Sequence, residues 1–196
     1  MPNVSNVKSK QLLYGTDTDA ISATGTATTL VLLNSGPWIN AQTVTLTSSA
    51  DNSGITFAIV GKDADGAAQT VAAHTGPNAT INSVTGTWTQ ITSITASGAI
   101  TTQIEAGVTG GATTGIVFAG RTRIRGLQGL SAATAGNLLF KNTSVTGTTL
   151  MTVPTSTSTT DLIEPYIPDN AVLFDAGAFV SFGAGLAAGV TVFYDG

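Results

Sequence analysis

The chain has 196 residues, of which only 9% are charged, and its formal net charge is -4 at pH 7. Such a weakly charged, acidic chain has little long-range field with which to attract nucleic acid, so nucleic acid is not expected as a partner. Cysteine is absent from the sequence, which excludes a disulfide scaffold, a thiolate metal site and a cysteine nucleophile.

The first twenty residues contain few apolar anchors and two of the seven basic residues, Lys8 and Lys10. No apolar run follows these lysines, so the segment lacks the pattern of a secretory signal peptide, and we expect synthesis in the cytoplasm. We predict an extended N-terminal arm over residues 1–20. Such an arm either becomes ordered on a partner or remains a loose tail.

We predict a β-sandwich domain over residues 21–108. No window repeats apolar residues at helical spacing, and Thr and Val dominate where a helix would favour Ala, Leu, Glu and Lys. The sequence therefore predicts an all-β protein of antiparallel sandwiches, Ig-like or jelly-roll-like, with Gly-, Asn- and Asp-rich turns between short strands. The expected strands are 28–33, 43–47, 55–60, 68–73, 88–95 and 100–106.

The small, Gly- and Thr-rich segment 109–120 is predicted to be a linker, followed by a second β domain over 121–196. The apolar run 171–194 is long enough for a membrane helix. However, it contains Asp175, four glycines and two β-forming clusters, so we expect two strands there and no membrane partner. The strands expected in this domain are 137–141, 149–153, 161–167, 171–174, 178–182 and 190–194.

The segment 61–66, GKDADG, is a candidate calcium half-site because Asp63 and Asp65 precede a glycine. Neither register of an EF-hand loop places the required Glu at its last position. The nearest upstream carboxylate, Asp51, lies beyond the strand predicted over 55–60, and so at the other end of that strand. We therefore interpret the segment as a turn whose Asp side chains bond their own backbone.

His74 is the only histidine, and a grouping with Asp51 and Ser53 is compatible with an up-and-down strand order. Nothing else in the sequence supports a Ser-His-Asp triad, because no GxSxG turn or oxyanion hole is evident. A transition-metal site would also need a second His or a Cys. We expect no catalytic residue, no cofactor and no metal site, and therefore no enzyme.

The strongest charge feature is the row Arg121, Arg123 and Arg125. Strand periodicity places the three guanidinium groups on one face and Thr122 and Ile124 on the other. Like charges aligned on a strand repel, and arginine favours bidentate pairing at interfaces. We predict a subunit interface formed by this row together with Lys8 and Lys10; a solvated face is the alternative.

Two segments carry a family resemblance. The first, 44–100, contains NSGITF, GKDADG, GPNAT and ITSI in that order, and the second contains TRIRGLQGLSAATAGNLLFKN, LMTVPT, IPDNAVLFDAGAFVSF and GVTVFYDG. Both resemble structural proteins of tailed-phage virions, particularly those of marine phages. The resemblance implies β-sandwich domains, many copies per particle and no catalysis. It transfers no binding residue and does not fix the location in the virion.

These features favour a capsid decoration, or cement, protein on the outer capsid surface of the virion. Its partners would be the major capsid protein and itself, as a homotrimer. A tail, neck or fibre component is the main alternative. A carbohydrate-binding or adhesin module is a third hypothesis, with Trp38, Trp88, Tyr166 and Tyr194 as candidate aromatic platforms, although aromatic residues in strand patterns more often pack in a core.

Overall fold

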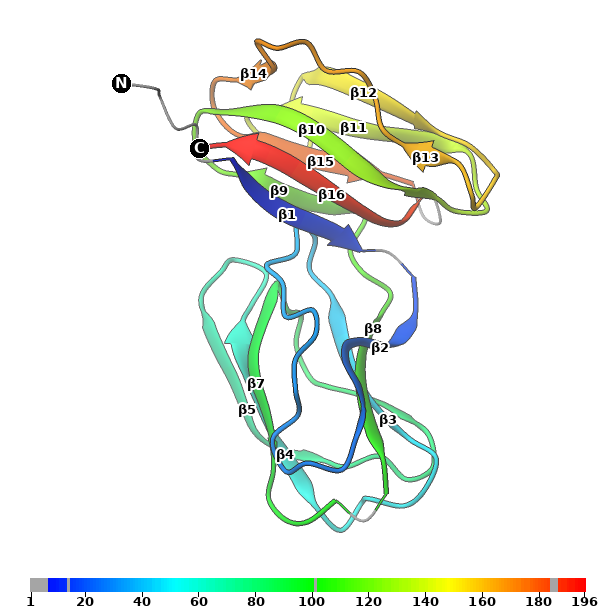
Figure 1. The fold of residues 1–196 in the computed structure, drawn as a ribbon. Helices are drawn as coiled ribbons and strands as arrows, with labels where there is room; N and C mark the ends of the chain where they lie inside the picture. The colour runs from blue at the N-terminus through cyan, green and yellow to red at the C-terminus, as the bar shows by residue number, and fades with distance from the viewer. Residues whose placement is uncertain (1–6, 14, 101, 184–186) are drawn as a thin grey trace. The chain divides into compact units, whose positions relative to one another are not determined.

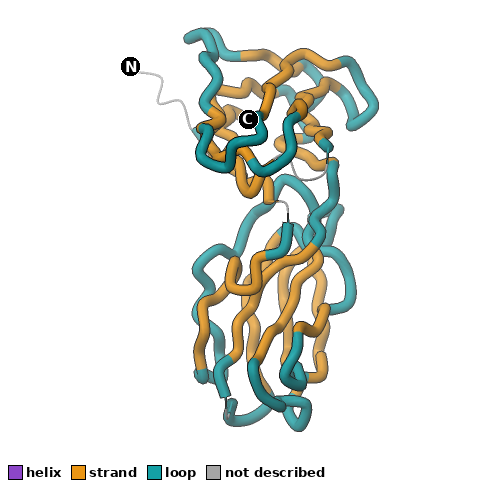
Figure 2. Tube along the Cα trace, turned by 90° about the vertical axis from the view of Figure 1, so that its right-hand side faces the viewer, coloured by secondary structure: helices purple, strands orange, loops and turns teal. Residues whose placement is uncertain are grey.

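The computed structural model describes residues 7–13, 15–100, 102–183 and 187–196, and all regular secondary structure in these ranges is β-strand (Figures 1 and 2). No helix in this part of the chain is long and apolar enough to cross a membrane. The chain divides into two compact units, residues 15–111 and residues 1–14 together with 112–196. The predicted all-β fold class is confirmed.

Residues 15–111 form a sandwich of two antiparallel sheets, which we call the inserted unit. One sheet has the order β2 (Asp17–Gly25), β8 (Ile104–Thr109), β3 (Thr43–Ser48) and β6 (Ile81–Ser83). The other has the order β5 (Ala68–Thr75), β4 (Thr56–Lys62) and β7 (Gln90–Ala96). Along β4, alternate side chains are buried, as expected of a strand with one face on a core. The largest buried side chains are Trp38, Trp88 and Phe57.

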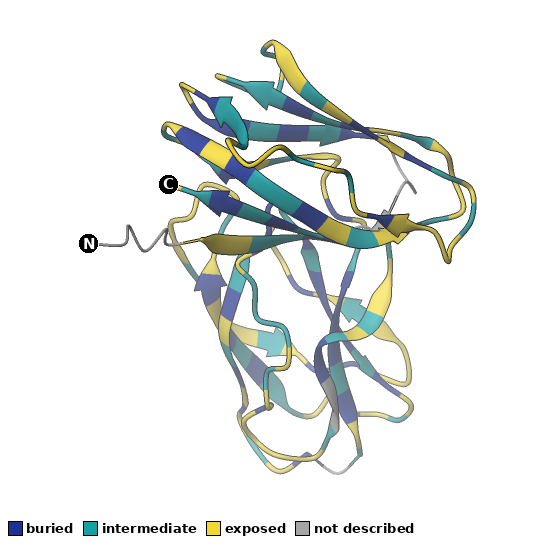
Figure 3. Ribbon diagram, turned by 45° about the horizontal axis from the view of Figure 1, so that its top comes forward, coloured by how far each residue is buried: buried dark blue, intermediate teal, exposed yellow. Residues whose placement is uncertain are grey.

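Residues 1–14 and 112–196 form a second sandwich. One sheet has the order β1 (Lys8–Leu13), β16 (Ala187–Asp195), β10 (Thr122–Ser131) and β13 (Leu162–Ile163), and β14 (Val172–Phe174) also pairs with β10. The other has the order β12 (Thr149–Thr155), β11 (Gly136–Asn142), β15 (Ala178–Phe182) and β9 (Thr114–Phe118). In β15 every second residue is buried. Buried stretches run along the strands (Figure 3), and buried residues such as Phe140 and Val192 form the core.

The strand order of this second sandwich is that of a jelly roll. When β13 and β14 are counted as one interrupted strand, the unit has eight strands in chain order. The first, eighth, third and sixth form one sheet, and the fifth, fourth, seventh and second form the other. This interleaving of two four-stranded sheets is the double Greek key of jelly rolls. We call residues 1–14 and 112–196 the jelly-roll unit.

The division of the chain differs from the predicted boundaries. Strand β1, which lies within the predicted arm, pairs with β16 over its whole length, from Lys8 opposite Tyr194 to Leu13 opposite Gly189. Strand β2 begins at Asp17, also within the predicted arm, and belongs to the inserted unit. Residues 1–6 and 14 of the predicted arm lie outside the described residues. The inserted unit therefore interrupts the jelly roll between its first and second strands.

The predicted linker 109–120 is wrong, because it contains strand β9, which pairs with β15. Segment 28–33, predicted as a strand, forms only an isolated bridge from Thr29 to Thr95. Leu30 is buried there, whereas Val31 and Leu33 are exposed. The strand predicted over 161–167 ends at Ile163, because Pro165 has no N–H for the ladder.

Candidate functional site

The arginine row lies at and near the start of β10. Thr122 and Ile124 are buried, at 3% and 0% relative exposure, while Arg121 and Arg123 are exposed, so the predicted alternation of faces is confirmed. The pairing of β10 with β16 shifts register between Ile124 and Gly126. This bulge makes Arg125 an extra residue and leaves it, like Gly126, on the outer face of the sheet.

Two of the three arginines have acidic partners within the chain. The Arg125 Nε atom lies 2.6 Å from Asp195 Oδ2, and its Nη1 donates to the main-chain oxygen of Asp169 at 3.0 Å. Arg121 lies 3.6 Å from Asp175 in a pair that is about 70% exposed and contributes at most ~1 kcal/mol. The repulsion that favoured an intersubunit role is therefore already offset within the chain. Arg123 has no ion pair in the described part of the chain.

The two lysines of the predicted interface lie apart from this row. In β1, Lys8 and Lys10 stand opposite Tyr194 and Val192, so they belong to the side of the sheet that faces the core. Their ammonium groups reach across the open edge of the sandwich, Lys8 to the main-chain oxygen of Gly196 at 2.5 Å and Lys10 to that of Ile116 at 3.2 Å. Within the unit the two lysines cover the edge of the sandwich. They do not lie on the outer face of β10 that carries the arginines.

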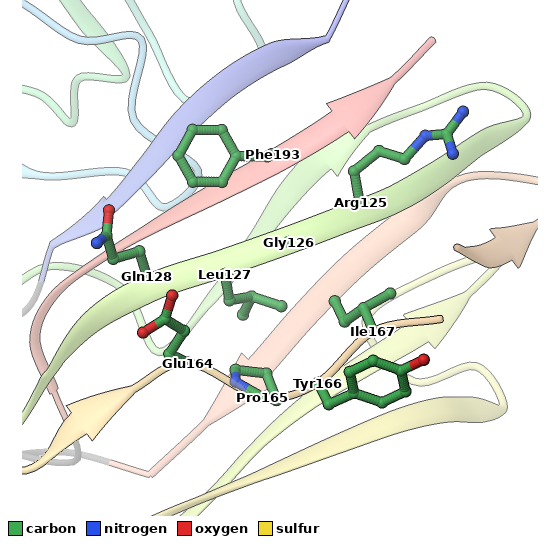
Figure 4. A pocket seen from close by; sticks show the side chains of 9 residues that line it. All are labelled: Arg125, Gly126, Leu127, Gln128, Glu164, Pro165, Tyr166, Ile167 and Phe193. Carbon is green, nitrogen blue, oxygen red and sulfur yellow. The ribbon is translucent and has the colours of Figure 1, made fainter. Parts of the chain in front are cut away.

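The jelly-roll unit contains a groove beside β10 that the sequence did not predict. β14 pairs with β10 at 122–124 and β13 pairs with it at 129–130. Between these pairings, residues 125–128 have no partner strand on this side among the described residues, because segment 164–171 leaves the sheet. The result is a groove of about 530 Å³ between β10 and this segment (Figure 4).

The walls of the groove combine an aromatic platform with polar groups. Its lining residues are Arg125, Gly126, Leu127, Gln128, Glu164, Pro165, Tyr166, Ile167 and Phe193. In Figure 4, Gln128 and Glu164 lie toward one end, and Arg125 and Tyr166 toward the other. Phe193 lies over Gly126, where a Cβ would be 3.5 Å from the Phe193 Cδ2 atom. The lining is therefore partly apolar and partly polar.

Only one of the four candidate aromatic platforms is available at the surface. Trp38, Trp88 and Tyr194 are 1%, 0% and 5% exposed, so their rings belong to the cores and cannot stack on a ligand. Tyr166 is 88% exposed and lines the groove. A sequence signal for this position exists in the prolines at 165 and 168, which flank Tyr166 and disfavour a continuous strand there.

The GKDADG segment is a turn between β4 and β5, as predicted. Asp63 Oδ1 accepts the N–H groups of Asp65 at 3.0 Å and Ala67 at 2.8 Å, and Gly66 has a positive φ of 81°. The Asp63 side chain is thus occupied by its own backbone. Among the described residues, no three His, Asp or Glu side chains are grouped closely enough to hold a metal ion.

Asp51 and Ser53 interact with each other, but no hydrogen bond joins either side chain to His74 in the described residues. The Ser53 side chain bonds to the Asp51 carboxylate and the Ser53 N–H donates to Asp51 Oδ1 at 2.8 Å, and both interactions lower the pKa of the Asp51 carboxyl. His74 stands in β5 opposite Phe57, and its Nε2 is buried without a hydrogen-bond partner. Burial lowers the pKa of His74 below its ordinary value.

This burial predicts an acid sensitivity of the inserted unit. The unfolded chain binds the His74 proton more tightly than the folded unit does, so stability is complete above the unfolded-state pKa of about 6.5. It is lost as the pH falls through that value toward the lower folded-state pKa. In urea titrations from pH 7.5 to pH 5, the midpoint should therefore fall more for the native chain than for His74→Gln. Parallel pH profiles would contradict this assignment.

Comparison of the chain with protein-family models, curated proteins and solved structures finds no match.

Proposed function

We propose that the protein is a structural component of a tailed-phage virion, a decoration (cement) protein that binds the outer head shell and reinforces contacts between major capsid subunits. The observation that carries the proposal is the jelly-roll strand order of residues 1–14 and 112–196, an architecture that recurs in viral capsid domains. A fold alone does not specify a function. The added support is the resemblance of segments in both units to virion proteins.

The inserted unit offers a surface by which such a protein can attach. Strand β5 has one strand partner, β4, in the described residues, and its eight residues AQTVAAHT include no Lys, Glu, Asp or Pro. An exposed edge without charged or proline residues is a template for strand addition from another chain. The edge of β7 is different, because segment 29–38 covers it through main-chain bonds such as Leu30 N–H to the Ile94 oxygen.

Virions of a phage that encodes this chain provide the test. We expect the protein in purified particles, in many copies distributed over the head, in a reconstruction of the intact virion. The double substitution Thr70→Lys and Ala72→Lys on the β5 edge should reduce incorporation into heads without lowering the melting temperature. The matched control is Thr95→Lys on the covered edge of β7. Absence from the particle would refute the proposal, and a few copies at one vertex would favour a tail, neck or fibre component.

A further inference from the structure

We propose that the groove between β10 and segment 164–171 of the jelly-roll unit binds a neutral oligosaccharide, with Tyr166 as the stacking platform. The groove volume of about 530 Å³ lies within the range of small-ligand sites, about 300–1,000 Å³. All of its lining residues belong to one compact unit. The site is distinct from the β5 edge and does not depend on the protein's location in a virion.

The exposure of Tyr166 is the first argument. Its side chain is 88% exposed, the highest value among the large apolar and aromatic residues that are exposed in the described chain. Pro165 and Pro168 restrict the backbone on both sides of it, so the ring is presented at a small further cost in conformational entropy. The negative face of an aromatic ring attracts the weakly positive C–H groups on the apolar face of a sugar.

The polar groups around the groove suit hydroxyl groups. The Gln128 amide both donates and accepts, and the Glu164 carboxylate accepts, while every sugar hydroxyl does both. Arg125 is held by Asp195 and by the Asp169 oxygen, so its remaining N–H donors are already oriented. The main chain of residues 125–128 adds N–H and C=O groups on the groove side. In the described part of the chain, no strand pairs with these residues on that side.

The charge of the groove favours a neutral ligand over an anionic one. Its lining groups that carry a charge near pH 7 are Arg125 and Glu164, and Arg125 is paired with Asp195. An anionic sugar or a phosphate would therefore meet the Glu164 carboxylate and a cation that is already neutralised. A peptide that extended the sheet along 125–128 would have to displace segment 164–167, which forms the opposite wall.

Binding of defined tetrasaccharides to the purified full chain tests the proposal. Cellotetraose, maltotetraose, laminaritetraose and tetra-N-acetylchitotetraose are titrated at millimolar concentration by calorimetry and saturation-transfer NMR, with tetragalacturonate as the acidic comparison. We expect at least one neutral sugar to bind. Tyr166→Ala should weaken that binding about tenfold, because the stacking surface is lost, whereas Tyr166→Phe should change it by less than about twofold.

Two further variants locate the binding in the groove. Glu164→Gln should weaken it several-fold, because an amide replaces one acceptor oxygen with a donor. Leu162→Ala, two residues away on β13 and 67% exposed but outside the groove lining, is the matched control and should have no effect. The proposal is overturned if no neutral sugar binds, if only tetragalacturonate binds, or if Tyr166→Ala binds as tightly as the native chain. Each of these results leaves the proposed virion role intact.

Discussion

Replacing Leu12 by alanine is expected to destabilise the jelly-roll unit by about 2–5 kcal/mol, the usual cost of truncating a fully buried leucine. Leu12 is 0% exposed and lies opposite Val190 of β16, which is also 0% exposed. The effect follows from the structure, since a residue in a detached N-terminal arm would be replaced at almost no cost. β1 is the edge strand of its sheet. If the truncation loosens β1, the main-chain hydrogen-bonding groups of β16 that pair with β1 are also exposed.

The two tryptophans allow the units to be followed separately. Trp38 and Trp88 are the only tryptophans in the chain, and both are buried in the inserted unit. Tryptophan fluorescence should therefore report an unchanged urea transition in Leu12→Ala. Hydrogen exchange in β10 and β16 should report the weakened jelly roll. Val7→Ala, at a site 51% exposed, is the control and should cost less than about 0.5 kcal/mol. A stable jelly roll in Leu12→Ala would refute the pairing of β1 with β16.

Replacing Gly61 by alanine is expected to destabilise the inserted unit by about 3 kcal/mol, at the upper end of the cost of overpacking. A Cβ at this position would lie 2.0 Å from the Gln90 main-chain oxygen and 3.1 Å from the Ile91 Cα. These main-chain atoms belong to the neighbouring strand β7 and cannot rotate away as a side chain would. β4 and β7 would have to separate, so the tryptophan transition should move to lower urea concentration.

Gly54→Ala is the matched control for Gly61→Ala. A Cβ at Gly54 meets nothing within 4 Å, and its φ is not positive, so the stability change should stay within about 0.5 kcal/mol. If Gly61→Ala and Gly54→Ala unfold at the same urea concentration, the close approach of β4 to β7 at this position is wrong. A difference between the two variants would show that Gly61, the first glycine of GKDADG, has a packing role that the turn pattern does not reveal.

Local sequence patterns predicted most strands, because strand periodicity and turn chemistry depend on residues that are close in sequence. Segment 178–182 was predicted with the observed bounds of β15, and the strand predicted over 43–47 matches β3 within one residue. The turn at 61–66 was also predicted, since Asp and Gly act there on their own backbone. Strands β1, β2 and β9 were missed. β1 and β2 are largely polar, β9 is short and lies in a segment rich in Gly and Thr, and all three pair with strands distant in sequence.

The candidate sites show the same contrast. The face of β10 that carries the arginines follows from a period of two and was predicted, while Asp195 and Asp175 as their partners were not. Aromatic content alone ranked Trp38, Trp88, Tyr166 and Tyr194 equally. Only burial in the folded units separates Tyr166 from the other three. The groove itself exists because β10 loses its neighbour between β14 and β13, a feature of pairing that composition does not encode.

The sequence by itself determined that this chain is all-β, where most of its turns lie and which face of β10 is charged, because periodicity and turn chemistry act over a few residues. Tertiary structure decided that β1 closes a jelly roll whose other strands begin at residue 114, and that residues 15–111 interrupt it. The physical reason is that strand pairing joins residues such as Leu12 and Val190 through long-range burial and hydrogen bonds, and the periodicity of a strand does not encode which distant strand it pairs with.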